Sequence, residues 1–448
     1  MIKVITYGTF DLLHYGHIRL LERAKDLGDY LIVGVTSEDF DKSRGKINVQ
    51  QSLMERVEAV RATGLADKIV IEEYEGQKID DIRKYDVDIF AVGSDWIGHF
   101  DYLNEYCKVT YLKRTEGVSS TDLRSKEQKV KLGLVGEDSL LLKHLHESHF
   151  VNGADVVVAY TEETAIKTEL EKEEIRLCDS YDEVLENCDA VYLVSVPEKH
   201  EEQIRKAIEC GKHVLCESPI ALKERTAKEL FDLAEQNNLI LMESIKTAYS
   251  TAYDRLLLLV KSGRIGQPVS IDSTCTSLRE IPPSLKEKNL IWTGFEAWAP
   301  TVLLPIFQIF GYNDTDISFL SSFYDDDKHF DKFTQINVGY PNAVAIAKVG
   351  VGVKAEGELI ISGTQGYIYV PAPWWKTDYF ELRYENQTHN KRYFYQLDGE
   401  GIRNEIVVFV RSIFNKESLS IISKETTIKI ADTFEKYINR EKLREIAW

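Results

Sequence analysis

Short runs of β-forming residues alternate with segments of helical periodicity in the first part of the chain. Residues 2–7 alternate β-formers, residues 18–25 carry apolar positions at helical spacing, and residues 30–36 predict a second strand. Gly8 and Thr9 turn the chain between the first strand and the helix. A strand, a turn, a helix and a further strand in this order are typical of an α/β fold with a parallel sheet.

The same alternation begins again beyond a short charged joint at residues 125–129. Residues 130–136, 155–160 and 190–196 predict strands of a second doubly wound unit. A chain of 448 residues is longer than one such unit needs, so at least two domains are expected. The expected fold class is therefore α/β, with two Rossmann-like domains in sequence.

Two histidines stand where the first predicted strand crosses into its helix. His14 and His17 are three residues apart with Gly16 between them, so both rings can face one side while the glycine lets a bulky ligand approach the backbone. A helix N-terminus at this point offers N–H donors and a positive dipole to a phosphate. We interpret the crossing as a nucleotide-binding site.

Three ordered motifs carry a resemblance to a known family. The segments 8–17, 93–101 and 114–121 resemble, in order and spacing, the motifs of the cytidylyltransferases, most closely of those that use glycerol 3-phosphate. The first segment reads Gly8-Thr9-Phe10-Asp11 and then His14-x-Gly16-His17. The alternative interpretation takes the histidines as core or surface residues and segment 114–121 as an ordinary helix cap. The resemblance implies transfer of CMP from CTP to a small phosphorylated polyol or sugar.

That reaction and the resemblance together imply a role for each matched residue. Attack of a phosphate oxygen on the α-phosphorus of CTP needs only alignment of two anions and neutralisation of charge on the phosphate oxygens. Arg114 suits either the leaving diphosphate or the edge of cytosine, and Mg²⁺ is expected to bridge the triphosphate. By resemblance the catalytic residues are His14, His17, Lys46 and Arg114, the nucleotide-binding residues are Thr9, Phe10, Asp11, Gly16, Asp95, Trp96, Ser119, Ser120 and Thr121, and the ligands of the substrate phosphate are Lys42, Arg44 and Arg56.

One basic loop and one departure from the family bear on the acceptor. Lys42, Arg44 and Lys46 follow the second predicted strand, where a solvated loop is the alternative to a substrate-binding site. Family members that use glycerol 3-phosphate carry an arginine where this chain reads residues 63–67, and Arg61 is the nearest basic residue. Glycerol 3-phosphate therefore indicates only the class of acceptor, and a larger polyol phosphate or a keto-sugar phosphate stays open.

From residue 130 onward the chain resembles a second family, the Gfo/Idh/MocA oxidoreductases. Residues 196–200 read Val-Pro-Glu-Lys-His where that family has a Thr-Pro-Asn-x-x-His stretch, and residues 207–217 are close to the family sequence. Residues 357–371 fit its antiparallel sheet. The resemblance implies a Rossmann dinucleotide-binding domain followed by an α+β domain, so the expected domains are residues 1–127, 128–247 and 248–448.

The loop that would bind a dinucleotide departs from the family pattern. Gly133 and Gly136 belong to that loop by resemblance, yet Glu137 and Asp138 follow where the next glycine belongs. Two carboxylates at this point would repel a pyrophosphate. The acidic residue that would hold the adenosine ribose is replaced by Tyr160 or its neighbour, which weakens the case for NAD and leaves NADP open.

The residues that would carry out the oxidoreductase chemistry are also missing. Ser218 stands where the family has its catalytic lysine, and a serine cannot act as a cationic proton donor. The Asp and His expected near residues 298–303 are absent. Lys246 is a possible substitute, and a solvated lysine is the favoured alternative. We therefore expect the second domain to be catalytically silent, with NAD(P) an open question.

Composition limits the classes of partner and the cellular location that can be expected. The net charge of −18 disfavours nucleic acid, and no apolar run is long enough to span a membrane. Six cysteines without a CxxC pair indicate reduced, buried thiols, and no signal sequence is present, so a cytoplasmic protein is expected. His144 and His146 point to different faces of a helix, so no metal site is expected there. Family resemblance suggests a homodimer.

Three functions remain after these exclusions. The first is a cytidylyltransferase that makes a CDP-activated alcohol for a cell-surface polymer such as capsule or teichoic acid, with a silent second domain. The second is a bifunctional enzyme whose second domain reduces a keto-sugar phosphate with NAD(P)H. In the third, the second domain is a regulatory or oligomerisation module.

Overall fold

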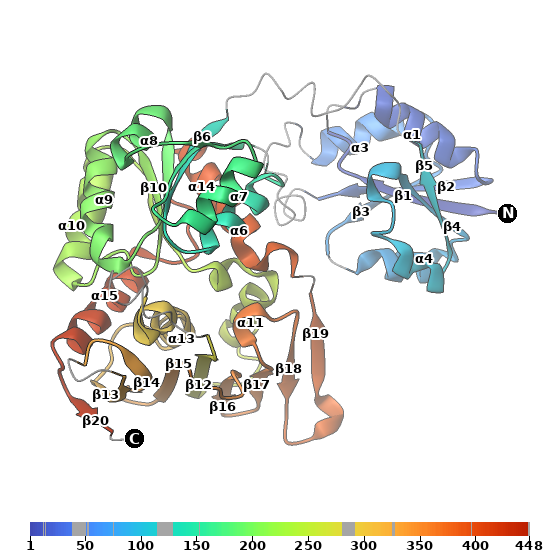
Figure 1. The fold of residues 1–448 in the computed structure, drawn as a ribbon. Helices are drawn as coiled ribbons and strands as arrows, with labels where there is room; N and C mark the ends of the chain where they lie inside the picture. The colour runs from blue at the N-terminus through green and yellow to red at the C-terminus, as the bar shows by residue number, and fades with distance from the viewer. Residues whose placement is uncertain are drawn as a thin grey trace. The chain divides into compact units, whose positions relative to one another are not determined.

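The structure is a computed structural model of the chain. It describes residues 1–11, 13, 15–37, 51, 53–74, 76–113, 129–151, 153–279, 292–324, 328–395 and 397–446. The chain divides into two compact units, Met1–Lys129 and Val130–Trp448 (Figure 1). The two units are taken in turn below.

The first unit is built on a five-stranded parallel sheet in the order β3-β2-β1-β4-β5. Its strands are β1 (Lys3–Gly8), β2 (Tyr30–Thr36), β3 (Lys68–Glu72), β4 (Ile89–Gly93) and β5 (Lys108–Leu112). Its helices are α1 (Tyr15–Lys25), α3 (Leu53–Ala62) and α4 (Gln77–Tyr85), and the 3-10 turns η1 (Ser94–Trp96) and η2 (Asp101–Glu105) follow β4. The predicted strand at residues 30–36 is confirmed, and the predicted first helix begins three residues earlier than expected.

Each face of this sheet has its own apolar core, because successive residues of a strand point to opposite sides. Val4 and Val33 pack with residues of α1 and α3 on one face, whereas Ile5 and Ile32 pack with Phe90 on the other. Strands buried on both faces explain why the sequence shows near-continuous apolar runs instead of strict alternation.

The second unit contains a six-stranded parallel sheet in the order β11-β10-β9-β6-β7-β8. Its strands are β6 (Val130–Gly136), β7 (Ala154–Tyr160), β8 (Arg176–Leu177), β9 (Ala190–Val194), β10 (His213–Glu217) and β11 (Leu241–Ser244). Its helices are α6 (Leu140–Ser148), α7 (Thr164–Lys172), α8 (Tyr181–Asn187), α9 (Pro197–Glu209) and α10 (Glu224–Gln236). The three strands predicted from the sequence are present, with bounds within two residues.

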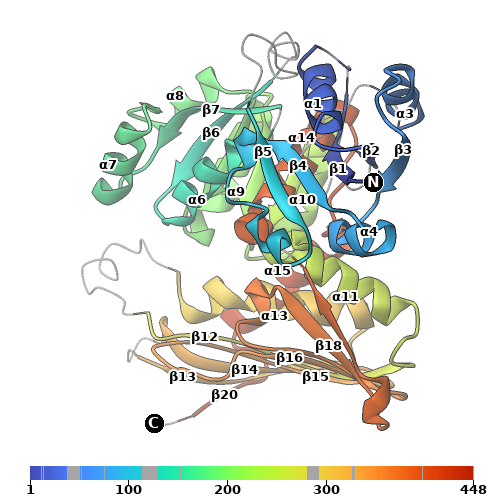
Figure 2. The same cartoon turned by 90° about the vertical axis from the view of Figure 1, so that its right-hand side faces the viewer.

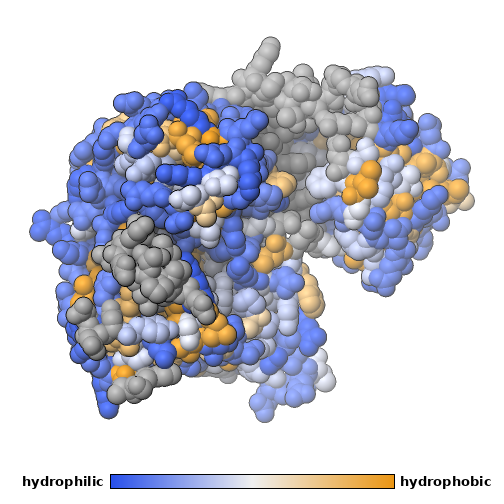
Figure 3. All heavy atoms as spheres, viewed as in Figure 1, coloured by the Kyte–Doolittle hydropathy of each residue, from blue (hydrophilic) through white to orange (hydrophobic). Residues whose placement is uncertain are grey.

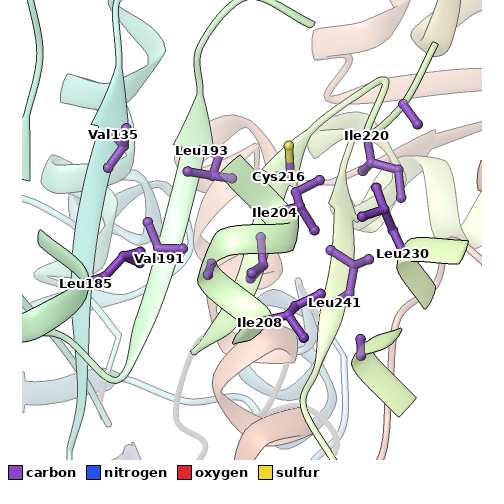
Figure 4. Packing of buried hydrophobic residues seen from close by; sticks show 14 of the residues in the cluster. Val135, Leu185, Val191, Leu193, Ile204, Ile208, Cys216, Ile220, Leu230 and Leu241 are labelled. Atoms are coloured by element: carbon purple, nitrogen blue, oxygen red, sulfur yellow. The ribbon is translucent and has the colours of Figure 1, made fainter. Parts of the chain in front are cut away.

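Helix α9 fills the core on one face of this sheet. Figure 4 shows Ile204 and Ile208 of α9 among Leu193, Cys216 and Leu241, which come from three adjacent strands. All of these side chains are buried. On the opposite side, His144 of α6 is buried, whereas His146 two residues later is 70% exposed, which confirms that these histidines point to different faces.

The rest of the second unit is a nine-stranded sheet covered on one face by helices. Its strands are β12 (Pro268–Ser277), β13 (Asp316–Phe323), β14 (Asp331–Gly339), β15 (Val344–Val351), β16 (Leu359–Gly363), β17 (Tyr367–Val370), β18 (Tyr379–Arg383), β19 (Lys391–Phe394) and β20 (Leu443–Glu445). Figure 2 shows α11 (Thr251–Lys261) and α13 (Gly294–Phe310) lying over one face. Strands β16 and β17, within residues 357–371, pair antiparallel as predicted, and the sheet as a whole is mixed, since β12 pairs with β15, and β13 with β20, in parallel.

Two late helices return to the Rossmann sheet. Helix α14 (Ile402–Asn415) packs against α6, and α15 (Lys424–Ile438) packs against α10. Ala431 of α15 belongs to the same core cluster as Leu230 of α10. The domain boundary expected at residue 248 therefore separates elements that share a core, and it stays a prediction.

Two expectations from composition are tested by the structure. All six cysteines are unpaired, but Cys210 is exposed and Cys107 is half-buried, so the expectation that all are buried is wrong for these two. Among the described residues, no helix is long and apolar enough to cross a membrane. Hydrophilic residues cover most of the second unit's face in Figure 3.

Candidate functional site

Two of the sequence motifs of the first unit follow β1 and β4, two neighbouring inner strands of the sheet. β1 and β4 are neighbours at the point where the strand order reverses, and parallel α/β sheets bind ligands outside the carboxyl ends of strands at such a point. The turn with Thr9, Phe10 and Asp11 leaves β1, and η1 with Trp96 leaves β4. Both motifs therefore begin at one edge of the sheet.

Most of the remaining predicted site residues follow the flanking strands in the sequence, whereas Gly16 and His17 lie in α1 and Arg56 lies in α3. β2 precedes the basic loop, and β5 precedes the closing motif. Nine predicted residues lie outside the described part of the chain or have an undescribed side chain: His14, Lys42, Arg44, Lys46, Asp95, Arg114, Ser119, Ser120 and Thr121. Their roles stay predictions.

Phe10 links the turn after β1 to the imidazole of His17. Its backbone has a left-handed φ of 54°, and its ring is fully buried. The ring meets His17 edge-on, with centroids 5.5 Å apart. A side chain at Gly8 would bring a Cβ to 3.0 Å from this ring. The glycine thus admits the phenyl ring, and the ring supports one side of the half-buried His17 in the first turn of α1.

Arg56 of α3 ties the ends of β1 and β2 together. Its guanidinium is fully buried, and Nη1 donates to the carbonyl oxygens of Thr9 and Thr36, each at 2.8 Å. Nε donates to the carbonyl oxygen of Gln51 at 3.1 Å, and the Gln51 amide donates to Asp11 Oδ1 at 3.0 Å. These bonds give Arg56 a positioning role under the turn. Its predicted contact with a substrate phosphate stays a prediction.

A buried polar cluster that the sequence analysis missed lies beside this turn. Glu72 ends β3, accepts a hydrogen bond from Thr36 Oγ1 at 2.9 Å, and forms an ion pair with Lys78 of α4. The Lys78 ammonium lies 4.8 Å from the Tyr7 ring centroid. Polar residues that directly end apolar strands, Thr36 and Glu72, were the available signal. Their pairing with Lys78 depends on how α4 packs, which no local pattern states.

Trp96 is the predicted nucleotide ligand with the most accessible side chain among the described residues. Its indole is 39% exposed, and its ring centroid lies 5.3 Å from that of His99 and 5.8 Å from that of Phe100. A supported, partly exposed aromatic ring at the carboxyl edge of a sheet is suited to stack on a base.

The second unit's β6–α6 crossing carries two carboxylates, Glu137 and Asp138. Gly136 has a φ of 145°, and a Cβ there would lie 2.5 Å from the Val194 carbonyl carbon, so this glycine serves strand packing. Glu137 follows with its carboxylate 6% exposed and paired with Lys199 at 3.0 Å. Asp138 Oδ1 accepts the Leu140 amide at the start of α6 at 2.8 Å. One amide at the start of α6 is thus bound by a carboxylate of the chain itself, and Glu137 brings a second carboxylate to the crossing.

The structure also places three other residues of the second unit that the sequence analysis singled out. Ser218 is buried and donates a hydrogen bond to Glu243 at 2.5 Å. Gly133 makes room for α8, because a Cβ there would lie 2.5 Å from Val184. Lys246 is only 18% exposed and pairs with Glu400 at 2.5 Å, so the favoured interpretation of a solvated lysine is wrong.

Comparisons with known proteins match the two units to different families. The family model described as "Cytidylyltransferase-like" matches residues 5–126, and "Oxidoreductase family, NAD-binding Rossmann fold" matches residues 130–245. Glycerol-3-phosphate cytidylyltransferase of Bacillus spizizenii is 50% identical over 124 residues, which are 28% of this chain and 95% of the relative. The enzyme of the same name from Staphylococcus aureus is 46% identical over 143 residues, 31% of this chain and 99% of the relative.

Solved structures match the second unit in fold alone. A 3-ketoreductase from Actinomadura kijaniata, in complex with NADP and TDP-benzene, has a TM-score of 0.63 at 16% identity and covers 72% of this chain and 100% of its own. A UDP-N-acetylglucosamine 3-dehydrogenase from Acidithiobacillus ferrooxidans has a TM-score of 0.57 at 16% identity, covering 69% of this chain and 96% of its own.

Proposed function

The chain belongs to the cytidylyltransferase-like family through its first unit, and we propose that it transfers CMP from CTP to a small polyol or sugar phosphate. The observation that carries this proposal is the 50% identity over 124 residues to a glycerol-3-phosphate cytidylyltransferase, a relative covered over 95% of its length. The adjacent placement of the first two motifs at the carboxyl ends of β1 and β4 supports it.

The proposed reaction is a single displacement. An oxygen of the acceptor phosphate attacks the α-phosphorus of CTP, the bond to the β-phosphate breaks, and diphosphate leaves. The catalytic work is alignment and stabilisation of charge on the phosphate oxygens. We assign N–H donation to His14 and His17, further cationic contacts to Lys46 and Arg114, and base stacking to Trp96. Mg²⁺ would neutralise the triphosphate.

Within this proposal the described residues prepare the site. Arg56 holds the carbonyl groups of Thr9 and Thr36, which fixes the backbone at the carboxyl ends of β1 and β2. Phe10 packs against His17 and limits the positions of its ring. Preorganised donors of this kind need no rearrangement as charge develops.

The acceptor and the setting belong to the proposal as well. We propose an acceptor like glycerol 3-phosphate, a CDP-activated product used for a cell-surface polymer such as capsule or teichoic acid, a homodimer, and a cytoplasmic location. The test is diphosphate release from CTP with a panel of phosphate esters that contains glycerol 3-phosphate, longer polyol phosphates and keto-sugar phosphates. Release above background with one ester identifies the acceptor, whereas none with any ester contradicts the proposal.

For the second unit we propose a catalytically degenerate oxidoreductase fold. Its support is the occupation of the β6–α6 crossing by Glu137 and Asp138, and the burial of Ser218 against Glu243. A bifunctional enzyme that also reduces a keto-sugar phosphate with NAD(P)H is the second candidate, favoured by likeness in fold to a 3-ketoreductase solved with NADP. A regulatory or oligomerisation role is compatible with the degenerate fold.

A further inference from the structure

Three lysines of the second unit converge on one carboxylate. Glu400 accepts hydrogen bonds from Lys143 at 3.1 Å, Lys246 at 2.5 Å and Lys376 at 2.9 Å. The four residues come from four elements: α6, η3 (Lys246–Tyr249), η4 (Trp374–Lys376) and η6 (Asp398–Gly401). We call Lys143, Lys246 and Lys376 the three-lysine cluster. Since these elements are distant in sequence, the cluster is a product of the tertiary fold.

The cluster carries more positive charge than its carboxylate neutralises. Three ammonium groups face the single charge of Glu400. Burial alone would raise the pKa of this carboxyl, but the hydrogen bonds from the lysines outweigh burial and lower the pKa to about 2. Lys143 and Lys246 bind the same oxygen, Oε2, so their charges lie within about 6 Å of each other. Such a local excess stands out in a chain whose net charge is −18.

The neighbouring acidic groups do not remove this excess. Glu147 of α6 is paired with Arg403 at 3.0 Å. Glu217 of β10 and Glu405 of α14 face Lys246, but burial raises the pKa of each to about 8, which favours their neutral forms at pH 7. Burial also lowers the pKa of Lys246, so the cluster is left with a net positive charge of at most two for an external anion.

A fixed turn holds Glu400 in front of the lysines. Gly399, Glu400 and Gly401 all have left-handed φ values, 62°, 53° and 93°. A Cβ on Gly401 would lie 2.0 Å from the Lys246 carbonyl oxygen, and a Cβ on Gly399 would lie 2.2 Å from Glu147 Oε2. The glycines thus permit a close approach that larger residues would block. Helix α14 begins directly after this turn without a side-chain cap, which adds positive potential.

The lysines keep donors for a ligand. An ammonium has three N–H donors, and Glu400 uses one from each lysine. Lys143 and Lys376 are 47% and 34% exposed, so they are accessible to a solute. Lys246 lies just beyond Ser244, the last residue of β11, and therefore at the carboxyl edge of the parallel sheet, where α/β folds bind ligands.

We propose that the three-lysine cluster is a binding site for the phosphate group of a phosphorylated metabolite, with Glu400 as the positioning residue that holds the lysines together. A phosphate monoester carries close to two negative charges at pH 7, so it is attracted to this local excess of positive charge. A diphosphate ester presents the same chemistry. The site gives the second unit a ligand-binding role that requires no nicotinamide cofactor, and it does not depend on the reaction proposed for the first unit.

The test is residue-resolved acetylation of the full-length protein. A limiting dose of an acetylating reagent is applied without ligand and with inorganic phosphate, glycerol 3-phosphate or CDP-glycerol, at matched ionic strength in potassium chloride. Mass spectrometry then gives the acetylation rate at each lysine. Lys424 is the internal control, because it is 30% exposed and paired with Asp232 and Glu235 elsewhere in the same unit.

We expect Lys143 and Lys376 to be acetylated about fivefold more slowly at saturating ligand, with Lys424 unchanged. The most protective compound identifies the phosphate source. Equal protection by potassium chloride alone, or no protection by any probe at about 10 mM, overturns the proposal. A double variant, Lys143→Gln with Lys376→Gln, should weaken the calorimetric binding of inorganic phosphate, which is neither the acceptor nor the product proposed for the first unit, by about tenfold or more, whereas Lys424→Gln should keep it.

Discussion

The binding partner of Arg56 could not be decided from its residue type alone. Sequence analysis places an arginine on the helix after the second strand, and a guanidinium suits a phosphate or a set of carbonyl oxygens equally well. In the structure the guanidinium is buried and donates to Thr9, Thr36 and Gln51. The choice between these partners depends on the depth of α3 against the sheet, which the sequence does not state.

Arg56→Lys separates the two roles. A lysine keeps the charge but cannot reach three carbonyl oxygens in one plane, so we expect the free energy of unfolding of the first unit to fall by about 2 kcal/mol. Thermal and urea unfolding measure this loss. A normal stability together with a raised KM for the acceptor phosphate would instead favour the role as a phosphate ligand.

His17→Ala tests the proposed catalytic histidine. Loss of one preorganised donor is expected to lower kcat by about 10²-fold or more while the fold is kept. Diphosphate release under saturating CTP and acceptor measures the change, with circular dichroism to check the fold. His146→Ala is the matched control, because this imidazole is 70% exposed in the second unit. Turnover near that of the wild type in folded His17→Ala protein would rule out the assignment.

At the scale of elements, the strands were the predictable part. Parallel strands buried on both faces have apolar runs that local sequence displays, and β2 and β6 match their predicted ranges. The pairing of β12 with β15 was not predictable, since these strands are far apart in the chain and no local signal sets their direction. The ion pair of Glu72 with Lys78 joins residues only six apart, and it was missed because it depends on how α4 packs against β3, which no local pattern states.

The β6–α6 crossing predicts weak binding of nicotinamide cofactors. Glu137 is buried against Lys199, and Asp138 takes an amide of α6, so a pyrophosphate would meet two carboxylates in place of free donors. We expect NADH and NADPH to bind the full-length protein with dissociation constants above about 1 mM. Calorimetric titration measures them. Micromolar binding, with oxidation of NADPH when a keto-sugar phosphate is added, would support the bifunctional alternative.

Two buried glutamates, one of them on helix α14, are expected to make the stability of the second unit depend on pH. Glu405 and Glu217 are joined through Ser244 Oγ, at 3.0 and 2.9 Å, and a hydroxyl has only one proton to donate. One carboxyl must therefore be protonated, which agrees with the pKa of each raised by burial to about 8. Because both pKa values lie above those of the unfolded chain, the contribution of this pair to stability is fully present below about pH 4.5 and is lost as the pH rises towards 8.

Glu405→Gln should weaken this dependence. The amide keeps the shape of the side chain and cannot ionise, so the melting temperature relative to the wild type should rise by about 3 °C between pH 5 and pH 8. Differential scanning fluorimetry across this range measures the effect. Glu425→Gln, which changes a glutamate in the first turn of α15, serves as the control. Parallel melting curves for wild type and Glu405→Gln would contradict the pairing.

At the scale of the whole molecule, one chain joins a unit with cytidylyltransferase relatives to a unit with an oxidoreductase fold. With a net charge of −18, anionic substrates would have to be met by local cations. We propose that the motif residues supply these cations in the first unit and that the three-lysine cluster supplies them in the second.

The central claim is that the chain is a CTP-dependent transferase, and the most direct measurement is ³¹P NMR of the full-length protein with CTP, Mg²⁺ and glycerol 3-phosphate. The account predicts a CDP ester and diphosphate in equal amounts, with UTP turned over about 10²-fold more slowly, because a site built for the amino group of cytosine leaves polar groups unpaired with uracil. Equal turnover of UTP and CTP, or no diphosphate with any phosphate ester, would contradict it.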